Sequence, residues 1–265
     1  MIGELTRQEG VKLFTQRFPY FLIAIVLALE AASMLIAALR PPASSLDVVT
    51  GAQLWADGAG VGLRLTTFVV LIIGAMSFSR ELSLGTAKTM LVLPVTRTQW
   101  ALGKLLALLL LAAALVVLVA LLGFVITVAT TGWGAVVREG VMLYSGAEVT
   151  RHAAAAIGIT VLLMLPLCTV SLLIGLHFSS SGAAVGVAVI LGVVLEAVVN
   201  LMDSAARYIF YFHLPRPFAL VSRLGRGMPF QWEPILTWGL GVALASFLVF
   251  GAWLLLKLER MDIRG

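Results

Sequence analysis

Long apolar runs alternate with short polar segments along the whole chain. Six of these runs approach or exceed the roughly 20 apolar residues that a helix needs to cross a bilayer. They are residues 19–39, 61–79, 101–130, 153–176, 182–201 and 234–256. Because lipid offers the backbone no hydrogen-bond partners, such runs must be helical, and the alternation typical of a membrane barrel is absent. The pattern predicts an all-α integral membrane protein, with residues 1–265 forming a single transmembrane domain.

Composition supports the same class of protein. Of 265 residues, 61% are hydrophobic and 12% are charged, whereas soluble domains average about 45–50% apolar and about 25% charged residues. The net charge of +5 is what basic residues flanking membrane spans produce, and it indicates no nucleic-acid partner. With the amino terminus inside, Lys and Arg divide ten to eight in favour of the inside, and all four lysines lie there. We therefore expect a multi-pass protein of the cell (inner, cytoplasmic) membrane with both termini cytoplasmic.

Two segments outside the spans carry their own patterns. In residues 1–18, Val11, Phe14 and Phe18 share one helical face, which predicts an interfacial helix, although a disordered tail is the alternative. Residues 202–233 hold too many aromatic residues for a simple loop and too many arginines and prolines for a span. They predict two short outer helices, broken at the sequence LPRP, that re-enter the interface. An aromatic belt on an ordinary loop would give a similar composition.

Motifs for chemistry are missing. Gly103-Lys104 lacks the upstream glycine of a phosphate-binding loop, and GAGVG at residues 58–62 fits a loose outer loop better than a dinucleotide site. The three histidines are scattered without metal-ligand spacing. We expect no catalytic residues, no metal and no cofactor bound by this chain, so the protein is not expected to be an enzyme.

The polar stretch between the second and third spans reads SRELSLGTAKTMLVLPVTRTQWALGK, residues 79–104. Leu84, Ala87 and Leu91 form an apolar stripe beside polar positions, which predicts a short amphipathic helix that ends at Pro94. A stiff helix rooted in two spans could transmit force from a soluble partner. It could equally be an interfacial connector without a partner.

The same stretch resembles the signature region of type-2 ATP-binding-cassette (ABC) transporter permeases. The resemblance rests on the order Glu81, Gly85-Thr86, Pro94-Val95-Thr96-Arg97 and Gly103-Lys104, with Thr96 in place of the common Ser. It implies that residues 80–98 form a coupling helix that docks on a separate ABC ATPase subunit. Two such ATPase subunits, which bind the ATP and Mg, and a second permease chain in a homo- or heterodimer would complete an exporter.

The resemblance also assigns roles to individual residues. The implied ATPase-coupling residues are Arg80, Glu81, Gly85, Thr86, Lys88, Pro94 and Arg97. The first five would contact or position the ATPase, and the last two would end and anchor the helix. Gly85 could instead only permit close backbone approach, and Arg97 could only reach toward lipid phosphates.

Carboxylates inside predicted spans are the remaining candidates. Such groups are costly in lipid and usually face protein or water. Glu30 lies within the first span, and Glu196 starts a polar stripe that continues through Asn200, Asp203 and Arg207. We expect Glu30, Glu196 and Asn200 to line a substrate path, or else to form a helix-packing seam. An ion-coupled secondary transporter that uses Glu30 and Glu196 is the competing function, and an intramembrane enzyme is a third. An apolar chain favours a lipid, amphipathic drug or peptide as substrate.

Overall fold

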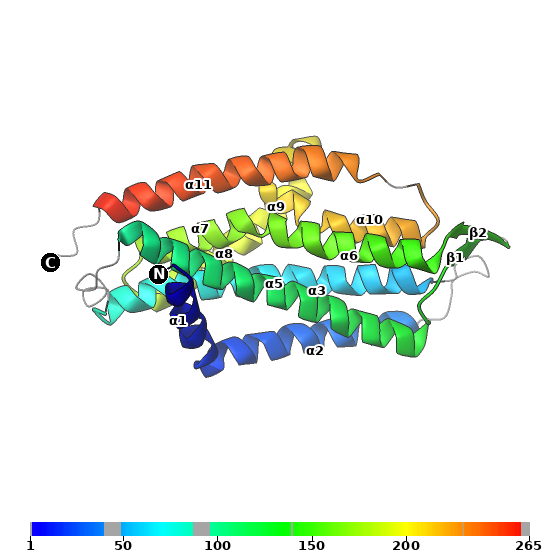
Figure 1. The fold of residues 1–265 in the computed structure, drawn as a ribbon, viewed down its shortest axis with the longest axis horizontal. Coiled ribbons are helices and arrows are strands. Elements are labelled where there is room, and N and C mark those ends of the chain that lie inside the picture. Colours follow the sequence, from blue (N-terminus) through cyan, green and yellow to red (C-terminus); the bar gives the residue numbers. More distant parts are fainter. Residues whose placement is uncertain (1, 40–48, 87–95, 139, 230, 261–265) are drawn as a thin grey trace.

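The computed structural model of the protein describes residues 2–39, 49–86, 96–138, 140–229 and 231–260. These residues form a long helical bundle (Figure 1). Within these ranges, six helical segments are long and apolar enough to cross a membrane: Arg17–Leu39, Gly51–Ser83, Arg97–Thr130, Gly146–His177, Ser181–Leu201 and Ile235–Arg260. The six predicted spans are confirmed as helices, and the protein is an all-α multi-pass membrane protein whose described residues also form one small hairpin.

The elements follow one another along the chain with short connections. In order they are α1 (Ile2–Phe14), α2 (Arg17–Leu39), α3 (Gly51–Ser83), α5 (Arg97–Thr130), β1 (Val136–Arg138), β2 (Val141–Tyr144), α6 (Gly146–Leu163), α7 (Leu165–His177), α8 (Ser181–Leu201), the 3-10 helix η1 (Asp203–Tyr208), α9 (Phe210–His213), α10 (Arg216–Gly225), the π-helix η2 (Ile235–Gly239) and α11 (Leu240–Arg260). We call the end of the bundle where α1 lies the terminal end, and the end with β1 and β2 the hairpin end (Figure 1).

Helix α3 forms the centre of the bundle, in contact with α2, α5, α7, α8 and α10. Small residues make this possible, because neighbouring helices approach its backbone closely. A Cβ added at Gly58 would overlap Met34, and one at Gly62 would lie 2.7 Å from Val119 Cγ1. The prediction of a loose loop at residues 58–62 was therefore wrong: these glycines lie inside α3 and serve helix packing.

Two further features differ from the expected boundaries. The second span begins at Gly51 rather than residue 61, where Thr50 caps the helix by accepting a hydrogen bond from the backbone of Gln53. Strands β1 and β2 pair in an antiparallel hairpin that the apolar pattern did not predict. Gly140 adopts a φ of 78° in its turn, a conformation that glycine adopts without steric cost.

The segment between α8 and α11 contains short helices rather than a span. Leu214 and Pro215 form a turn between α9 and α10, which is where the sequence LPRP was expected to break the helix. Helix α10 packs on α3 and α6. Helix α10 lies in the hairpin half of the bundle, and α9 lies nearer its middle (Figure 1).

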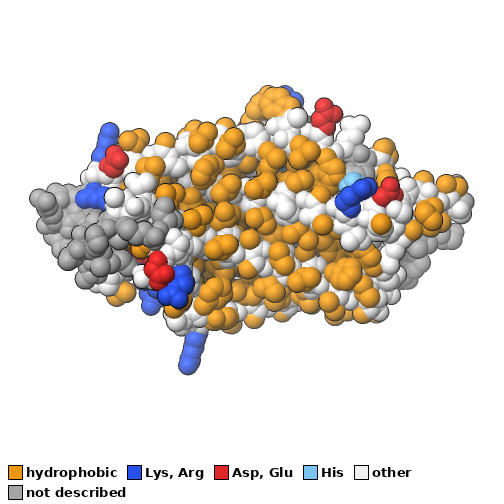
Figure 2. Space-filling model, viewed as in Figure 1, with side chains coloured by type: hydrophobic (Ala, Val, Ile, Leu, Met, Phe, Trp, Pro, Cys, Tyr) orange, Lys and Arg blue, Asp and Glu red, His pale blue; other side chains and the backbone are white. Residues whose placement is uncertain are grey.

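Apolar side chains dominate the middle of the visible surface. Charged side chains gather toward the two ends (Figure 2). A helical bundle with an apolar belt between two charged ends matches the requirements of a bilayer. The terminal end and the hairpin end would then lie at opposite membrane surfaces.

Candidate functional site

Helix α1 lies across the terminal end of the bundle and packs on α5 (Figure 1). Its contact face is close, because a Cβ added at Gly103 of α5 would lie 3.0 Å from Leu5 Cβ. The opposite face exposes Val11 and Phe14. The short connection between Phe14 and Arg17 keeps α1 beside the start of α2.

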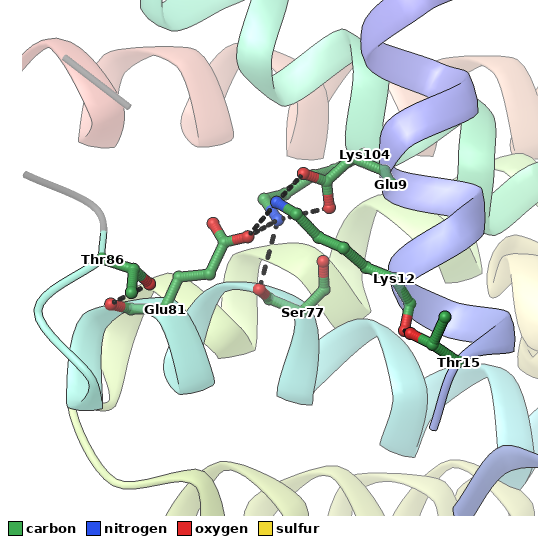
Figure 3. Close-up of polar contacts among 7 residues, drawn as sticks. All are labelled: Glu9, Lys12, Thr15, Ser77, Glu81, Thr86 and Lys104. Atoms are coloured by element: carbon green, nitrogen blue, oxygen red, sulfur yellow. Dashed lines mark hydrogen bonds and ion pairs between the residues drawn. The ribbon is translucent and has the colours of Figure 1, made fainter. Parts of the chain in front are cut away.

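Four charged side chains from three helices meet beneath α1 (Figure 3). Lys104 Nζ of α5 lies 2.8 Å from Glu9 Oε2 of α1 and 2.9 Å from Glu81 Oε1 of α3. Lys12 Nζ of α1 lies 2.7 Å from Glu9 Oε1 and 3.0 Å from the same Glu81 oxygen. Lys104 also donates a hydrogen bond of 3.3 Å to the Ser77 carbonyl. We call Glu9, Lys12, Glu81 and Lys104 the terminal ion cluster.

The terminal ion cluster is largely withdrawn from solvent. The Lys104 side chain is 1% exposed, Glu9 is 8% exposed and Glu81 is 13% exposed. The ammonium of Lys104 also lies 5.2 Å from the ring centroid of Phe78 and 5.6 Å from that of Trp100, so aromatic faces complete its surroundings. Because two positive and two negative groups balance, each buried charge has a partner.

Burial and ion pairing in the terminal ion cluster shift the pKa values of Glu9 and Lys12, its two members from α1. Burial alone would raise the pKa of Glu9, but the Lys104 ammonium and hydrogen bonds from Lys104 and Lys12 outweigh it and hold that pKa below its ordinary value. Burial would lower the pKa of Lys12, yet hydrogen bonds to Glu9 and Glu81 raise it. Both groups therefore stay charged at neutral pH.

The terminal ion cluster lies where the α3–α5 connection begins. Helix α3 ends at Ser83, and Gly85, two residues further on, adopts a φ of 70° that stops the helix from continuing. Thr86 Oγ1 donates to the Glu81 carbonyl at 3.3 Å. Helix α5 starts with Thr96 as its cap in a capping box with Gln99. Both ends of the connection are thus fixed by local hydrogen bonds.

The predicted helix over residues 80–98 is described only at its two ends. Residues 80–83 are the last turn of α3, and Arg97 opens α5, while Lys88 and Pro94 lie outside the described residues. Arg97 Nη1 donates to the carbonyls of Leu258 at 2.7 Å and Glu259 at 3.0 Å. Arg97 therefore anchors the start of α5 to the end of α11.

The implied coupling residues fall into different settings. Arg80 is exposed, whereas Glu81 points inward to the lysines of the terminal ion cluster. Sequence reasoning missed Glu9, Lys12 and Lys104 as members of one site. A signal was available, since Lys104 stands inside the apolar run of the third span and needs a buried partner.

Glu30 lies apart from this cluster, between α2, α3 and α5. Its side chain is fully buried, and neither carboxylate oxygen has a hydrogen-bond partner among the described residues. Two glycines face this carboxyl: a Cβ added at Gly62 would lie 2.8 Å from Oε2, and one added at Gly123 would lie 3.3 Å from Oε1. Glycine at both positions makes the space that this carboxyl occupies.

Glu196 and Asn200 lie on α8 and do not meet Glu30. Glu196 Oε1 is 3.8 Å from Arg64 Nη1 of α3, and Asn200 Nδ2 donates to the Glu196 carbonyl at 2.8 Å. The predicted continuous stripe was wrong beyond Asn200. The α-helix ends at Leu201, and Asp203 and Arg207 belong to the 3-10 helix η1, so they do not continue the face.

A pocket of about 500 Å³ opens beside the terminal ion cluster. Lys12, Arg80 and Glu81 line it together with apolar side chains such as Phe18 and Met76. Within the described ranges, no group of three or more His, Cys, Asp or Glu residues could hold a metal ion. The arrangement is suited to holding helices in register.

The fold and this arrangement define a multi-pass membrane protein with a buried ion cluster at one end. The chain belongs to the family described as "Protein of unknown function (DUF2705)", which matches residues 14–264. A comparison with curated proteins finds no match.

Proposed function

We propose that this protein is the permease subunit of an ATP-driven exporter of the type-2 ABC class. The observation that carries the proposal is the terminal ion cluster. It joins α1 to the end of α3 and the start of α5, directly at the segment that resembles a coupling region. Two ATPase subunits and a second permease chain would complete the transporter, with both termini in the cytoplasm.

In this proposal the terminal ion cluster transmits force. A displacement of the α3–α5 connection acts on Glu81 and Lys104, and the ion pairs carry it to α1 and so to the first span. Arg97 carries it to α11 through the carbonyls of Leu258 and Glu259. Rigid helices that move together in this way fit alternating access by rigid-body motion.

Contact with the ATPase is assigned to exposed groups. Arg80 is exposed and its side chain lines the pocket beside the connection, so it can reach a docked partner. Glu81 would act by positioning this surface. Re-entrance of α9 and α10 into the outer interface, and α1 as an interfacial helix, belong to the same proposal.

The substrate path is assigned to the outer surface of α8. Asn200 is exposed and Glu196 is partly exposed, so both can face a second permease chain. Glu30 is enclosed by helices of its own chain and reaches such a path only if α2 moves. The apolar surroundings favour a lipid, amphipathic drug or peptide.

Purification of the tagged full-length chain from its native membranes in mild detergent tests the proposal. We expect an ATPase to co-purify with the wild type, less of it with Arg80→Ala, and an unchanged amount with Arg151→Ala. Arg151 is exposed on α6 near the hairpin end and serves as the matched control. Absence of any co-purifying ATPase from the wild type would refute the proposal.

One observation favours a second function, ion-coupled transport. Glu30 is a fully buried carboxyl without a partner among the described residues, a setting typical of ion and proton sites in transporters. This alternative requires transport by the purified chain alone under a proton gradient, and its loss in Glu30→Gln. Transport that needs ATP and a partner would exclude it.

A further inference from the structure

Helix α10 has two faces with different chemistry. One face is buried on the bundle: the Phe218 ring centroid lies 5.2 Å from that of Trp55, and the Gly225 carbonyl accepts a 2.8 Å hydrogen bond from Thr50. The other face carries Arg216, Ala219, Leu220 and Arg223, with the spacing i, i+3, i+4 and i+7. Such spacing aligns the two arginines along one side of the helix.

A pocket of about 520 Å³ lies over this second face. Its other lining residues are Pro229, Gln231 and Pro234, together with Ile235 at the start of η2. Leu220 and Ile235 give it apolar surface, and Gln231 adds an amide. Its volume falls within the roughly 300–1,000 Å³ typical of small-molecule sites.

The charge of this pocket is not balanced. Its described lining residues include Arg216 and Arg223 but no carboxylate, and neither arginine forms an ion pair with a described residue. Arg226, one turn further on, shows the contrast, because it pairs with Asp57 at 3.3 Å. The two guanidinium groups beside apolar walls are therefore available to bind an anion.

Arg216 is also held in place. Its guanidinium carbon lies 3.8 Å from the ring centroid of Phe212, so the aromatic face orients the planar group. Burial lowers the pKa of Arg216, yet a guanidinium stays protonated in proteins. An oriented guanidinium loses little entropy when it binds an oxyanion.

We propose that this pocket binds an anionic amphiphile. Arg216 and Arg223 would bind its phosphate or other oxyanion, and Leu220 and Ile235 would contact its apolar part. Paired guanidinium groups match the geometry of phosphate and carboxylate. Helix α10, which forms one wall of the pocket, lies in the hairpin half of the bundle (Figure 1). This inference does not depend on the proposed transport function.

Calorimetric titration of the full chain with dodecyl phosphate, in phosphatidylcholine nanodiscs, tests the site. We expect the wild type to bind dodecyl phosphate and the double variant R216Q/R223Q to bind it at least about tenfold more weakly. R151Q removes one charge near the same end outside the pocket and should bind like the wild type. Dodecyl maltoside, which has the same chain and no charge, should not bind.

Replacement of Arg216 removes its packing on the Phe212 ring and can destabilise the fold. The single variant R223Q tests the site without that change. Arg223 is exposed, so we expect R223Q to fold like the wild type. Because it removes one of the two guanidinium groups, we expect R223Q to bind dodecyl phosphate several-fold more weakly. Equal affinity of R223Q, R216Q/R223Q and the wild type would overturn the proposal. Binding of dodecyl maltoside as tight as that of dodecyl phosphate would overturn it as well.

A second arm separates two sources of the anion. Phosphatidylglycerol is added to the nanodiscs and the titration is repeated. If phosphatidylglycerol competes with dodecyl phosphate in the wild type, a membrane lipid occupies the pocket. If dodecyl phosphate binds with unchanged affinity, the pocket takes a free amphiphile. Both results support an anionic amphiphile site, provided that the arginine variants weaken binding.

Discussion

Glu9 and Glu30 are two buried carboxylates of the same chain in opposite settings. Glu9 has Lys12 at 2.7 Å and Lys104 at 2.8 Å, whereas the Glu30 oxygens have no partner among the described residues. A buried charge is tolerated when opposite charges and hydrogen bonds replace water, and it is costly otherwise. The contrast suggests that Glu9 holds helices together, while Glu30 is kept at a cost to stability for another reason.

Replacement of Lys104 should cost the most stability. Lys104→Met leaves Glu9 and Glu81 buried with Lys12 as their single counterion, so we expect a loss of about 3–5 kcal/mol in the free energy of unfolding. Denaturation of the purified protein in detergent measures it. Lys257→Met is the control, since Lys257 lies at the same end without an ion pair to a described residue. An equal, small loss in both variants would contradict the role of the cluster.

Combining Lys104→Met with Glu9→Gln sharpens this result. The double variant keeps one lysine and one glutamate, Lys12 and Glu81, so the charges balance again. We expect it to be more stable than the sum of the single changes predicts, by about 1–3 kcal/mol. Strict additivity would mean that the two side chains do not interact.

The space around Glu30 provides a second test. Gly62→Ala places a methyl group 2.7 Å from Val119 Cγ1 and 2.8 Å from Glu30 Oε2, and we expect a loss of about 1–3 kcal/mol from overpacking. Gly60→Ala is the matched control in the same helix, because nothing lies within 4 Å of its added Cβ. That change should stabilise the protein by about 0.5–1 kcal/mol. Similar losses at both sites would show that the packing is looser than described.

Replacement of Glu30 itself should have the opposite sign to Lys104→Met. Glu30→Met removes a buried polar group without partners and keeps a similar volume, so we expect a gain of about 1–2 kcal/mol in unfolding free energy. The same denaturation measurement tests it. A loss of stability would show that Glu30 has a stabilising partner. A gain accompanied by loss of transport would mark a functional carboxyl.

The smallest expected effect is the dependence on pH. Because the pKa of Glu9 in the folded protein lies below its ordinary value of 4.5, its carboxylate stabilises the fold above pH 4.5. That contribution is lost as the pH falls through 4.5 and further. The raised pKa of Lys12 keeps its contribution complete below its ordinary value of 10.5. Melting temperatures from neutral to acidic pH should fall more for the wild type than for Glu9→Gln, and parallel curves would contradict this.

The six spans could be read from sequence because hydropathy over about 20 residues reflects a constraint that every membrane helix obeys. The ends of these spans could not be predicted as accurately as their existence. Helix α3 extends ten residues beyond the predicted start at residue 61, because glycines that suit a loop also suit close helix contact with Met34 and Glu30. The small hairpin of β1 and β2 was hidden for another reason, since strands of three and four residues leave little periodicity.

The terminal ion cluster could not be predicted from the sequence. Glu9 and Lys104 are 95 residues apart, and no local pattern pairs them. The resemblance implies that Glu81 contacts or positions an ATPase, and the structure adds that its side chain points inward to two lysines. This direction depends on tertiary packing, because Lys104 comes from α5 and Lys12 from α1. Lys88 and Pro94 of the implied coupling helix lie outside the described residues, so their roles stay predictions.

Site-specific photocrosslinking in native membranes tests the central claim, that a partner ATPase drives this permease from the terminal end. The photoreactive residue p-benzoylphenylalanine is placed at Leu84, which is 65% exposed next to the α3–α5 connection, or at Val137, which is 51% exposed in the hairpin. We expect an ABC ATPase to be captured from Leu84 and not from Val137. Capture from Val137 alone, or from neither position, would contradict the claim.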